Sequence, residues 1–555
     1  MSPAQLPALA GRVVQDLAQP PGFVRIPLDA AADIGGLVER AARLWPERVA
    51  WRFDPSGEWL SFAEVERRTR ALAAALAADG IGPGDRVALL APNSPAFPLS
   101  WIALARLGAT TVPVNVRYRR RDLAHVLRAS APKLLLAAPC ALETAAAAAA
   151  YAESSVRVVD LDAYLAAAGG SAADPGLPAD PGLPADTALP ASAPGPDAVA
   201  NIQFTSGTTG PPKGCVLSHR YWLALAWTLM REAPGITAED VLFTAQPMSY
   251  IDPQWNVIVA LAAGAELVVA DGFHPTTFWE RVRHYGVTYF YCLGLMPVLL
   301  ERMPPSPEDR AHRVRLIQAS AIPPALHRTL EERWGAPWLE AFGMTETGSD
   351  LFMPEIEGSR FAASSWIGVP RAHREAAVVT PAGDVARAGE RGELWIRGDG
   401  LFLGYLGEED RGSDPDAWFP TGDIVQHDGA GRIAYVGRTK DMIRRSGENV
   451  SAVEVESVIT AHPAVQVSAV TGLPDELRGE EVACFVLREP GDARADAELF
   501  RDLAEYCAAE LASFKIPRYW KAVTKFPRTA SERVAKHRLS ESLDRSSFWD
   551  LRSER

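Results

Sequence analysis

Hydroxyl, glycine and lysine residues gather in one short stretch of the chain, residues 204–219. An apolar run at residues 199–204 predicts a short buried strand that leads into this stretch. Glycines let backbone N–H groups approach a bulky anion, hydroxyl side chains add donors, and a lysine supplies a mobile positive charge. The stretch therefore predicts a loop that closes over a polyphosphate. Its polar residues and glycines are Thr205, Ser206, Gly207, Thr208, Thr209, Gly210, Lys213 and Gly214.

The spacing of this loop differs from that of two common nucleotide-binding loops. A Walker loop has serine or threonine directly after its lysine and then a helix, whereas Gly214 follows Lys213. The dinucleotide pattern GxGxxG is not present in the stretch either. The alternative is a flexible surface loop, because such loops are often rich in glycine, serine and threonine. The ordered hydroxyls, glycines and single lysine directly after a buried strand favour phosphate binding.

Residues 204–219 closely resemble the phosphate-binding loop of the adenylate-forming (ANL) superfamily, which includes acyl-CoA synthetases, peptide-synthetase adenylation domains and luciferases. Three further stretches, residues 340–346, 418–424 and 437–450, are similar to later motifs of that family and occur in the family's order. Within the family, the chain looks most like an acyl-CoA synthetase, or AMP-dependent ligase, near the carnitine-CoA-ligase type.

The resemblance implies how ATP is bound. In the family, the phosphate loop with Lys213 holds the phosphates, Thr345 bonds a phosphate, and Glu346 holds Mg²⁺. A carboxylate is a suitable ligand for a hard cation, and an aromatic face suits a base. The family normally has tyrosine where this chain has Phe342, and we expect Phe342 to stack on adenine. The other nucleotide contacts implied by the resemblance are Ala319, Ser320, Ala341, Gly343 and Met344.

Later motifs imply a ribose contact and a hinge. Asp423 matches the family's ribose-binding aspartate, since one carboxylate can accept hydrogen bonds from both ribose hydroxyls. Arg438 is expected to contact the ribose or the phosphates, and Lys440 matches the family's hinge. The loop with Gly447 and Glu448 matches the segment that swings toward the active site and lines the pantetheine channel. Rotation about a hinge lets one chain catalyse two successive steps, formation of an adenylate and then transfer of the acyl group.

The last motif departs from the family pattern. In the family, this motif ends with a glycine followed by a lysine, and the lysine reaches the reacting carboxylate and the α-phosphate. This chain has Glu532 in place of the glycine and Arg533 in place of the lysine. Arginine is larger, planar and permanently protonated. Lys536 follows nearby, and we place Arg533 ahead of it as the lid cation. The alternative is that this last motif has lost its catalytic contact and serves only for packing. The expected catalytic partners of the lid cation are Thr205, Lys213 and Glu346.

A turn predicted at residues 247–254 carries the expected acid-binding side chains, Tyr250, Asp252 and Gln254. Ala319 and Ser320 are expected to line the same pocket. Many aliphatic CoA ligases of the family have histidine near the position of Tyr250. Tyrosine together with Asp252 favours a polar or aromatic acid, or an acid with an amine. The alternative is that these three side chains pack behind the pocket.

These motifs predict an ATP-dependent ligase that activates a carboxylic acid as acyl-AMP and transfers it to CoA. ATP, Mg²⁺ and CoA are the expected small-molecule partners. Two other functions stay open from the residues. One is adenylation of a non-carboxylate oxyanion such as nitrite, for diazotisation of an aryl amine, which the altered lid residue brings into consideration. The other is a non-catalytic homologue that only binds nucleotide.

The composition excludes several other classes. The 555 residues exceed one ordinary core, and 48% hydrophobic with 23% charged residues is typical of globular proteins. The net charge of −13 argues against a nucleic-acid or anionic-membrane surface. Five separated cysteines without a CxxC pair fit reduced thiols. With neither signal peptide nor membrane-spanning run apparent, we expect a cytoplasmic protein, with a homodimer as a possible assembly.

Strand and helix patterns alternate along much of the sequence, which favours an α/β fold with helices on the faces of parallel sheets. The resemblance extends from about Ile34 to Leu539. It implies a large domain of residues 1–439, with βα-layered sheets and a small β-barrel-like part. A small mobile α+β lid domain of residues 440–555 follows, with its hinge at Lys440. Residues 172–197, rich in proline, alanine and glycine, are predicted to form a flexible insert.

Several local signals predict where helices begin. Ser61 with Glu64 three residues later predicts a capping box. Ser218 predicts the start of a helix over residues 220–231, and the nearly pure alanine run at 141–150 predicts a surface helix.

Overall fold

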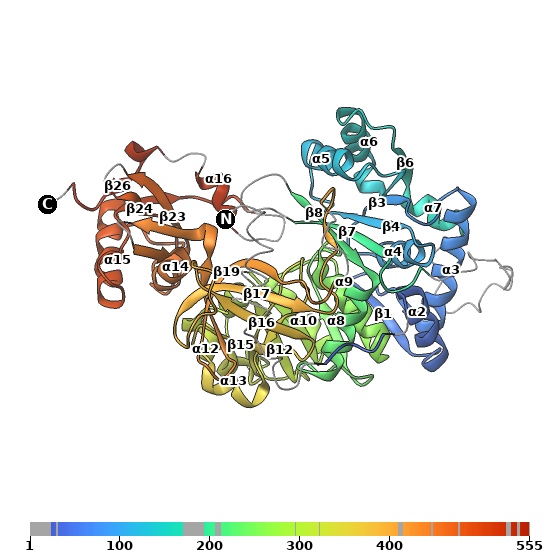
Figure 1. The fold of residues 1–555 in the computed structure, drawn as a ribbon, viewed down its shortest axis with the longest axis horizontal. Helices are drawn as coiled ribbons and strands as arrows, with labels where there is room; N and C mark the ends of the chain where they lie inside the picture. The colour runs from blue at the N-terminus through green and yellow to red at the C-terminus, as the bar shows by residue number, and fades with distance from the viewer. Residues whose placement is uncertain are drawn as a thin grey trace.

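A large domain of layered sheets is followed by a smaller α+β domain in a computed structural model of the chain (Figure 1). The predicted α/β class is confirmed. The predicted insert at 172–197 lies mostly outside the described residues. The structure describes residues 24–28, 32–169, 194–205, 212–294, 296–320, 322–408, 414–445, 448–475, 478–528, 534–540 and 544–553. Among these residues, no helix has the length and apolar character needed to cross a membrane.

The first sheet contains the strands that lead into and out of the phosphate loop. β7 (Val199–Thr205) lies parallel to β4 (Thr110–Val114), and β8 (Lys213–Ser218) returns antiparallel to β7. The short β18 (Gly404–Tyr405) pairs antiparallel with β8. On the other side of β4 the parallel strands are β3 (Arg86–Leu90), β5 (Leu134–Ala137) and β6 (Arg157–Asp160).

The second sheet changes from parallel to antiparallel across its width. Its parallel strands, in spatial order, are β1 (Val49–Asp54), β10 (Glu266–Ala270), β9 (Val241–Thr244), β11 (Tyr289–Leu293), β12 (Leu316–Ser320) and β13 (Trp338–Phe342). β2 (Trp59–Ser61) lies antiparallel beside β1. Past β13 the order continues through the antiparallel β14 (Leu351–Phe352), β15 (Trp366–Pro370), β20 (Ile433–Arg438), β19 (Phe419–His427), β17 (Arg391–Gly398) and β16 (Arg374–Val379).

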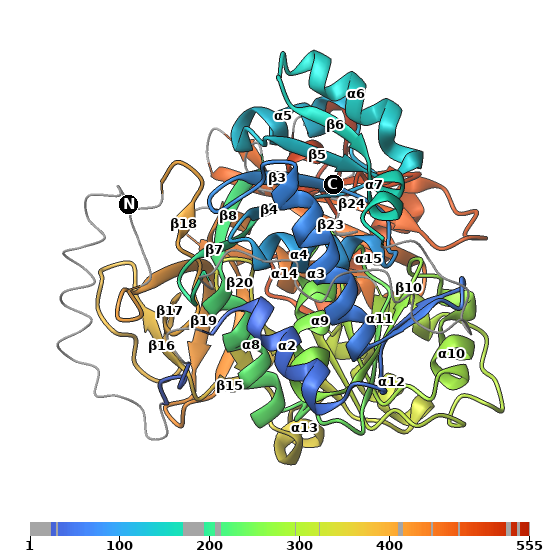
Figure 2. The same ribbon diagram turned by 90° about the vertical axis from the view of Figure 1, so that its right-hand side faces the viewer.

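Helices fill the space between the sheets and cover their outer faces. One core joins both sheets to α2 (Ile34–Leu44), α3 (Phe62–Ala78), α4 (Ala96–Arg106), α8 (His219–Arg231) and α9 (Ile251–Ala263). A second core packs the second sheet against α10 (Pro275–His284), α11 (Met296–Glu301) and α12 (Pro324–Trp334). In Figure 2 the outer face of the first sheet carries α5 (Arg120–Ser130) and α6 (Leu142–Tyr151). The remaining short helices here are η2 (Pro139–Ala141), α7 (Leu161–Ala167) and α13 (Glu355–Phe361).

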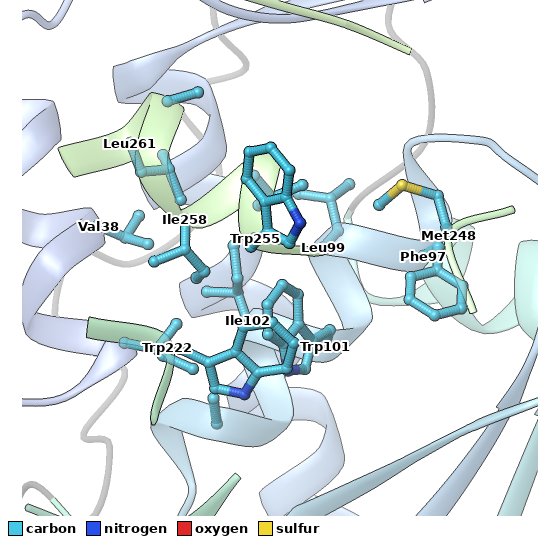
Figure 3. Packing of buried hydrophobic residues seen from close by; sticks show 14 of the residues in the cluster. Val38, Phe97, Leu99, Trp101, Ile102, Trp222, Met248, Trp255, Ile258 and Leu261 are labelled. Atoms are coloured by element: carbon cyan, nitrogen blue, oxygen red, sulfur yellow. The ribbon is translucent and has the colours of Figure 1, made fainter. Parts of the chain in front are cut away.

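Helix α4 of the central core is mostly apolar because neighbours contact it all round. All 11 residues of α4 are buried. Its side chains interlock with those of α8 and α9 (Figure 3). The rings of Trp101 and Trp222 meet edge to face, with centroids 5.0 Å apart. Both indole N–H groups donate to Asn201 Oδ1, at 2.7 and 3.1 Å, so this core is fixed to β7.

The helix caps follow the sequence signals in part. Ser61 Oγ accepts the N–H of Glu64 at 3.2 Å, which confirms the predicted start of α3. The reciprocal half of the predicted capping box is wrong, because the Glu64 carboxylate accepts two hydrogen bonds from Arg67, at 2.9 and 2.7 Å. Ser218 caps α8 as predicted.

Two other local predictions need correction. The turn predicted at residues 247–254 is confirmed only for its first half, where the N–H of Tyr250 donates to the Pro247 carbonyl at 2.9 Å, because α9 begins at Ile251 and includes the second half. The alanine run does form a helix, α6, but it is not only a surface helix. Ala145 and Ala148 are fully buried against the first sheet, because the methyl groups let α6 approach closely.

The C-terminal domain packs two helices, α14 and α15, on one face of its own sheet. Arg302, directly after α11, links it to the large domain: it forms an ion pair with Glu489 and donates to the carbonyls of Val465 at 3.4 Å and Gln466 at 3.3 Å. The elements of this domain and the turn before it are η3 (Thr439–Asp441), β21 (Met442–Arg445), β22 (Glu448–Ser451), α14 (Ala452–Thr460), β23 (Val465–Asp475), β24 (Gly479–Arg488), α15 (Asp496–Glu510), β25 (Tyr519–Val523), α16 (Lys536–Ser540), η4 (Arg545–Ser547) and β26 (Trp549–Asp550).

Replacement of Gly264, which ends α9, is expected to destabilise the folded protein. Its φ is +75°, and an added Cβ would lie 2.5 Å from the ring of Trp45. We expect Gly264→Ala to lower the free energy of unfolding by about 2–4 kcal/mol, from left-handed strain and overpacking together. Gly80 is the matched control, because its φ is +80° and an added Cβ would meet nothing within 4 Å. Gly80→Ala should cost only the strain, about 1–2 kcal/mol. Equal losses in urea or thermal unfolding would contradict the packing argument.

Candidate active site

The phosphate loop closes a β-hairpin. β7 and β8 are antiparallel neighbours, and Thr205 pairs with Lys213 across the two strand ends. Thr205 Oγ1 also donates to the Lys213 carbonyl at 3.4 Å. Gly214 permits the close approach, since a Cβ there would lie 2.8 Å from Ile202 Cγ2. The predicted phosphate-loop residues between these strands, Ser206, Gly207, Thr208 and Thr209, lie outside the described residues.

Glu346 is brought beside this hairpin by a tight turn after β13. The N–H of Gly348 donates to the carbonyl of Met344 at 2.7 Å, and a Cβ at Gly343 would lie 1.9 Å from the Gly348 carbonyl oxygen. Glu346 is only 8% exposed, and the Tyr405 hydroxyl donates to its Oε1 at 2.9 Å. Burial raises the pKa of Glu346, although the Tyr405 hydrogen bond acts in the opposite direction.

A second cluster gathers an aromatic face, a carboxylate and a guanidinium. The buried Asp423 accepts hydrogen bonds on Oδ1 from Arg438 at 3.0 Å and from the Tyr435 hydroxyl at 3.3 Å. Phe342, at the end of β13, has its ring centroid 6.5 Å from that of Tyr435. The Arg438 charge also acts on Glu346 and works to lower its pKa. The predicted adenine, ribose and metal residues thus form one contiguous region.

The ends of the parallel strands carry further polar contacts. Ser320, at the end of β12, donates to the Ala341 carbonyl at 2.6 Å and lies 2.5 Å from the Tyr291 hydroxyl oxygen. Ala319 is fully buried beneath it. The adjacent ends of β12 and β13, which carry Ala319, Ser320 and Ala341, therefore lie next to the turn that holds Thr345 and Glu346.

The expected acid-pocket residues differ in their surroundings. Asn115 follows β4, and its side-chain amide donates to the Tyr250 hydroxyl at 3.1 Å. Asp252 lies half-buried in the first turn of α9. Gln254 is fully buried: it accepts from Asn201 at 2.9 Å. Gln254 also donates to Gln203 Oε1 at 3.3 Å and to the Met248 carbonyl at 3.0 Å. The geometry of Gln254 is that of a residue supporting the pocket from behind.

The structure describes only some of the residues expected in the hinge and the lid. Lys536 starts α16, and its Nζ lies 2.7 Å from Glu456 Oε1. Burial lowers the pKa of Lys536, but the charges of Glu456 and Asp441 outweigh this and raise it. Lys440 is part of the turn η3, and the predicted residue Glu448 starts β22. Arg533 and Gly447 lie outside the described residues, as do the side chains of Lys440 and Glu448.

The predicted Mg²⁺ ligand was tested against this geometry. Within the described ranges no group of three or more His, Cys, Asp or Glu side chains could hold a metal by itself. Mg²⁺ in nucleotide enzymes commonly uses one or two carboxylates, with phosphate oxygens and waters as the other ligands. The buried carboxylate of Glu346, beside the phosphate-loop hairpin, fits that mode.

Sequence profiles agree with this arrangement. The profile of AMP-binding enzymes matches residues 38–406, and the profile of the AMP-binding enzyme C-terminal domain matches residues 454–533. The chain belongs to the AMP-binding enzyme family. The predicted membership of the adenylate-forming superfamily is confirmed.

Individual relatives of this AMP-binding enzyme are CoA ligases. An oxalate–CoA ligase of Arabidopsis thaliana is 31% identical over 518 residues, which cover 90% of this chain and 96% of the relative. A crotonobetaine/carnitine–CoA ligase of Salmonella paratyphi B is 31% identical over 474 residues, which cover 83% of this chain and 89% of the relative.

Solved structures of AMP-binding enzymes share the whole architecture. ATP-bound MatB from Rhodopseudomonas palustris has a TM-score of 0.79 and 26% identity, and the match covers 92% of this chain and 99% of MatB. The o-succinylbenzoate CoA synthetase of Bacillus subtilis, in complex with its acyl-adenylate intermediate, has a TM-score of 0.77 and 25% identity. That match covers 91% of this chain and 97% of the synthetase.

Sequence reasoning missed three residues that contact members of the candidate site. Tyr405 contacts Glu346, Tyr435 contacts Asp423, and Asn115 contacts Tyr250. Asn115 had a usable signal, because it follows directly after a buried parallel strand. Tyr405 and Tyr435 lie in antiparallel strands, whose sequence gives no indication of which side chain faces a distant motif.

Gln254→Leu tests the role of the buried amides. The leucine would leave the Asn201 amide, Gln203 Oε1 and the Met248 carbonyl without their partner. We expect the free energy of unfolding of the AMP-binding domain to fall by about 2–4 kcal/mol, because stranded buried polar groups keep their desolvation penalty. Differential scanning calorimetry of the full chain measures it. Gln466→Leu, at a half-exposed glutamine, should change stability by less than about 0.5 kcal/mol. Equal effects of the two variants would refute a special role for the amides.

Proposed function

We propose that this chain is an ATP-dependent acid–CoA ligase that forms an acyl-adenylate and then an acyl thioester. One observation carries the proposal: the Thr205–Lys213 hairpin and the buried Glu346 lie together, joined through Tyr405. The relatives described above are acid–CoA ligases, which agrees with this reaction. They give no support to nitrite adenylation or to a non-catalytic homologue.

The first half-reaction activates the acid. A carboxylate oxygen attacks the α-phosphorus of ATP, the P–O bond to pyrophosphate breaks, and the acyl-adenylate and pyrophosphate form. No general base is needed, because the nucleophile is already an anion. The chain holds the reactants in line and offsets the developing charge with Lys213 and the backbone N–H groups of the loop. Asp423 and Arg438 hold the ribose side of the nucleotide, and Phe342 provides a face for the adenine.

Mg²⁺ is part of the proposal, with Glu346 as its protein ligand. The ion would neutralise phosphate charge when bound with the nucleotide. The buried carboxylate supports this assignment, because a fixed, poorly solvated anion attracts a nearby cation strongly. Thr345, in the same turn, is proposed to bond a phosphate oxygen.

The second half-reaction transfers the acyl group. The CoA sulfur attacks the acyl carbon, the C–O bond to AMP breaks, and the thiol proton leaves to solvent. We propose that residues 440–555 rotate as a lid about Lys440 between the two steps, so that Gly447 and Glu448 line the thiol channel. Placement of Lys440 in the short turn before the C-terminal sheet supports the hinge. Residues 172–197 are proposed to be an insert outside this cycle.

The acid is proposed to be polar. Tyr250 and Asn115 form a hydroxyl–amide pair at the ends of β4 and the 247–250 segment, and Asp252 adds a carboxylate on the first turn of α9. Such groups favour an acid with a second polar or charged group over a plain aliphatic chain. The compartment is proposed to be the cytoplasm, because all five cysteines are free thiols and four of them are buried.

A substrate screen tests the function. Purified protein with ATP and Mg²⁺ should release pyrophosphate with one or more polar carboxylic acids, and should give AMP and an acyl-CoA of the expected mass when CoA is added. Lys213→Ala and Asp423→Ala should each lower kcat/KM for ATP by at least about tenfold. Nitrite-dependent AMP release without CoA would favour the alternative reaction. Absence of pyrophosphate release with every acid and with nitrite would reject adenylation.

The lid cation can be assigned by comparing two variants. We propose that Arg533 supplies the lid charge in adenylation, because Lys536 is already paired with Glu456 inside the lid. Arg533→Ala should lower the rate of acyl-adenylate formation by about 100-fold or more, since it removes transition-state charge stabilisation. Lys536→Met should mainly lower the melting temperature, because it leaves the Glu456 carboxylate unpaired. Single-turnover assays of each half-reaction, with melting curves, distinguish these effects. A selective loss of adenylation in Lys536→Met would reverse the assignment.

A further inference from the structure

Tyr405 contacts two groups of the proposed nucleotide site at once. Its hydroxyl donates to Glu346 Oε1 at 2.9 Å. Its ring lies beneath the Lys213 ammonium, whose Nζ is 4.6 Å from the ring centroid. Tyr405 lies outside every motif that indicated the function, and the proposed reaction gives it no role so far.

The backbone around Tyr405 holds this side chain in a fixed position. The N–H groups of Leu403 and Leu406 donate to carbonyls of β8 at 2.8 and 2.7 Å, and Tyr405 is paired with β8 between them. At the other end, the N–H of Phe402 donates to the backbone carbonyl of Glu346 at 2.8 Å. The segment therefore attaches to both the phosphate-loop hairpin and the turn that carries Glu346.

The environment of Glu346 makes the phenol hydroxyl useful. Glu346 is only 8% exposed, so few water molecules can hold its carboxylate in one orientation. A hydrogen-bond donor from the protein fixes the orientation of such a carboxylate. The Tyr405 phenol supplies such a donor without adding a charge that would repel the cation.

We propose that Tyr405 is a positioning residue that orients the Glu346 carboxylate toward a nucleotide-bound divalent cation. The inference rests on the proposed function, because it assumes that Glu346 meets the cation carried by ATP. It extends that function by naming a residue that acts through Glu346. Contact with Lys213 places the same ring at the phosphate-binding side of the site.

Tyr405→Phe isolates the hydroxyl, because it retains the ring under Lys213. By isothermal titration calorimetry at pH 7, we expect binding of Mg²⁺–ATP to weaken by about tenfold or more, the range expected for a hydrogen bond to a charged group. Binding of ATP in EDTA should change by less than about twofold.

Two further variants make the outcome decisive. Tyr151→Phe is the matched control, because it removes a hydroxyl from an exposed tyrosine on α6, away from the proposed site. In a Glu346→Gln background the charged acceptor of the Tyr405 hydrogen bond is absent, so Tyr405→Phe should add less than about a twofold effect on Mg²⁺–ATP binding. This cycle remains informative if the single variant loses some stability.

Each result has a distinct meaning. Equal weakening of Mg²⁺–ATP and metal-free ATP binding by Tyr405→Phe would overturn the inference, as would no change in either. An undiminished effect of Tyr405→Phe in the Glu346→Gln background would overturn it too. If the unaltered protein does not bind Mg²⁺–ATP at all, the proposed function itself fails, whatever Tyr405 does.

Discussion

The antiparallel return of β8 along β7 is the interaction on which the proposed site depends. In a parallel sheet a strand normally leads into a crossover, which would carry the residues after the loop to another place. Here the hairpin brings Thr205 and Lys213 to the same edge of the sheet. β8 then offers its free side to β18, and this second antiparallel pairing brings Tyr405 beside Glu346. A local reversal of strand direction thus gathers the cation, the carboxylate and the phenol from separate parts of the chain.

The hairpin is in turn anchored in the core by buried polar groups. Asn201 on β7 accepts hydrogen bonds from two core tryptophans, and it donates to Gln254 on α9. Gln203, two residues further along β7, donates to the Ser249 carbonyl at 2.5 Å. Each of these groups would be costly to leave without a partner, so the strand and the start of α9 hold one relative position. The phosphate loop and the proposed acid pocket therefore share a single rigid support.

Much of the fold, and the neighbouring positions of Lys213, Glu346 and Asp423 in the candidate site, could be predicted from sequence because their signals are local. Strand and helix periodicity, Ser61 and Ser218 as caps, and the short motifs around Lys213, Glu346 and Asp423 each depend on residues close together in the chain. The missed features depend on contacts across long separations. Tyr405 and Glu346 lie 59 residues apart, and Gln254 and Asn201 lie 53 apart. Periodicity does not show which polar side chain turns inward, so the sequence does not distinguish Gln254 from a pocket residue or the start of α9 from a turn. Glu64 illustrates the same limit at short range, because Arg67 competes successfully for its carboxylate.

The start of α9 combines side chains that are proposed to contact the acid with a side chain that supports the core. Acid preference can therefore change without a change in the fold. Tyr250 and Asp252 lie at the end of the helix that the acid is proposed to contact, whereas Gln254, on the same turn, is locked into the protein interior. Exchanging the first two side chains would alter the chemistry offered to an incoming acid and leave the scaffold for ATP untouched. Redesign of acid preference should therefore vary Tyr250, Asp252 and the neighbouring Asn115 in combination. Gln254, whose buried amide supports this region, should be kept.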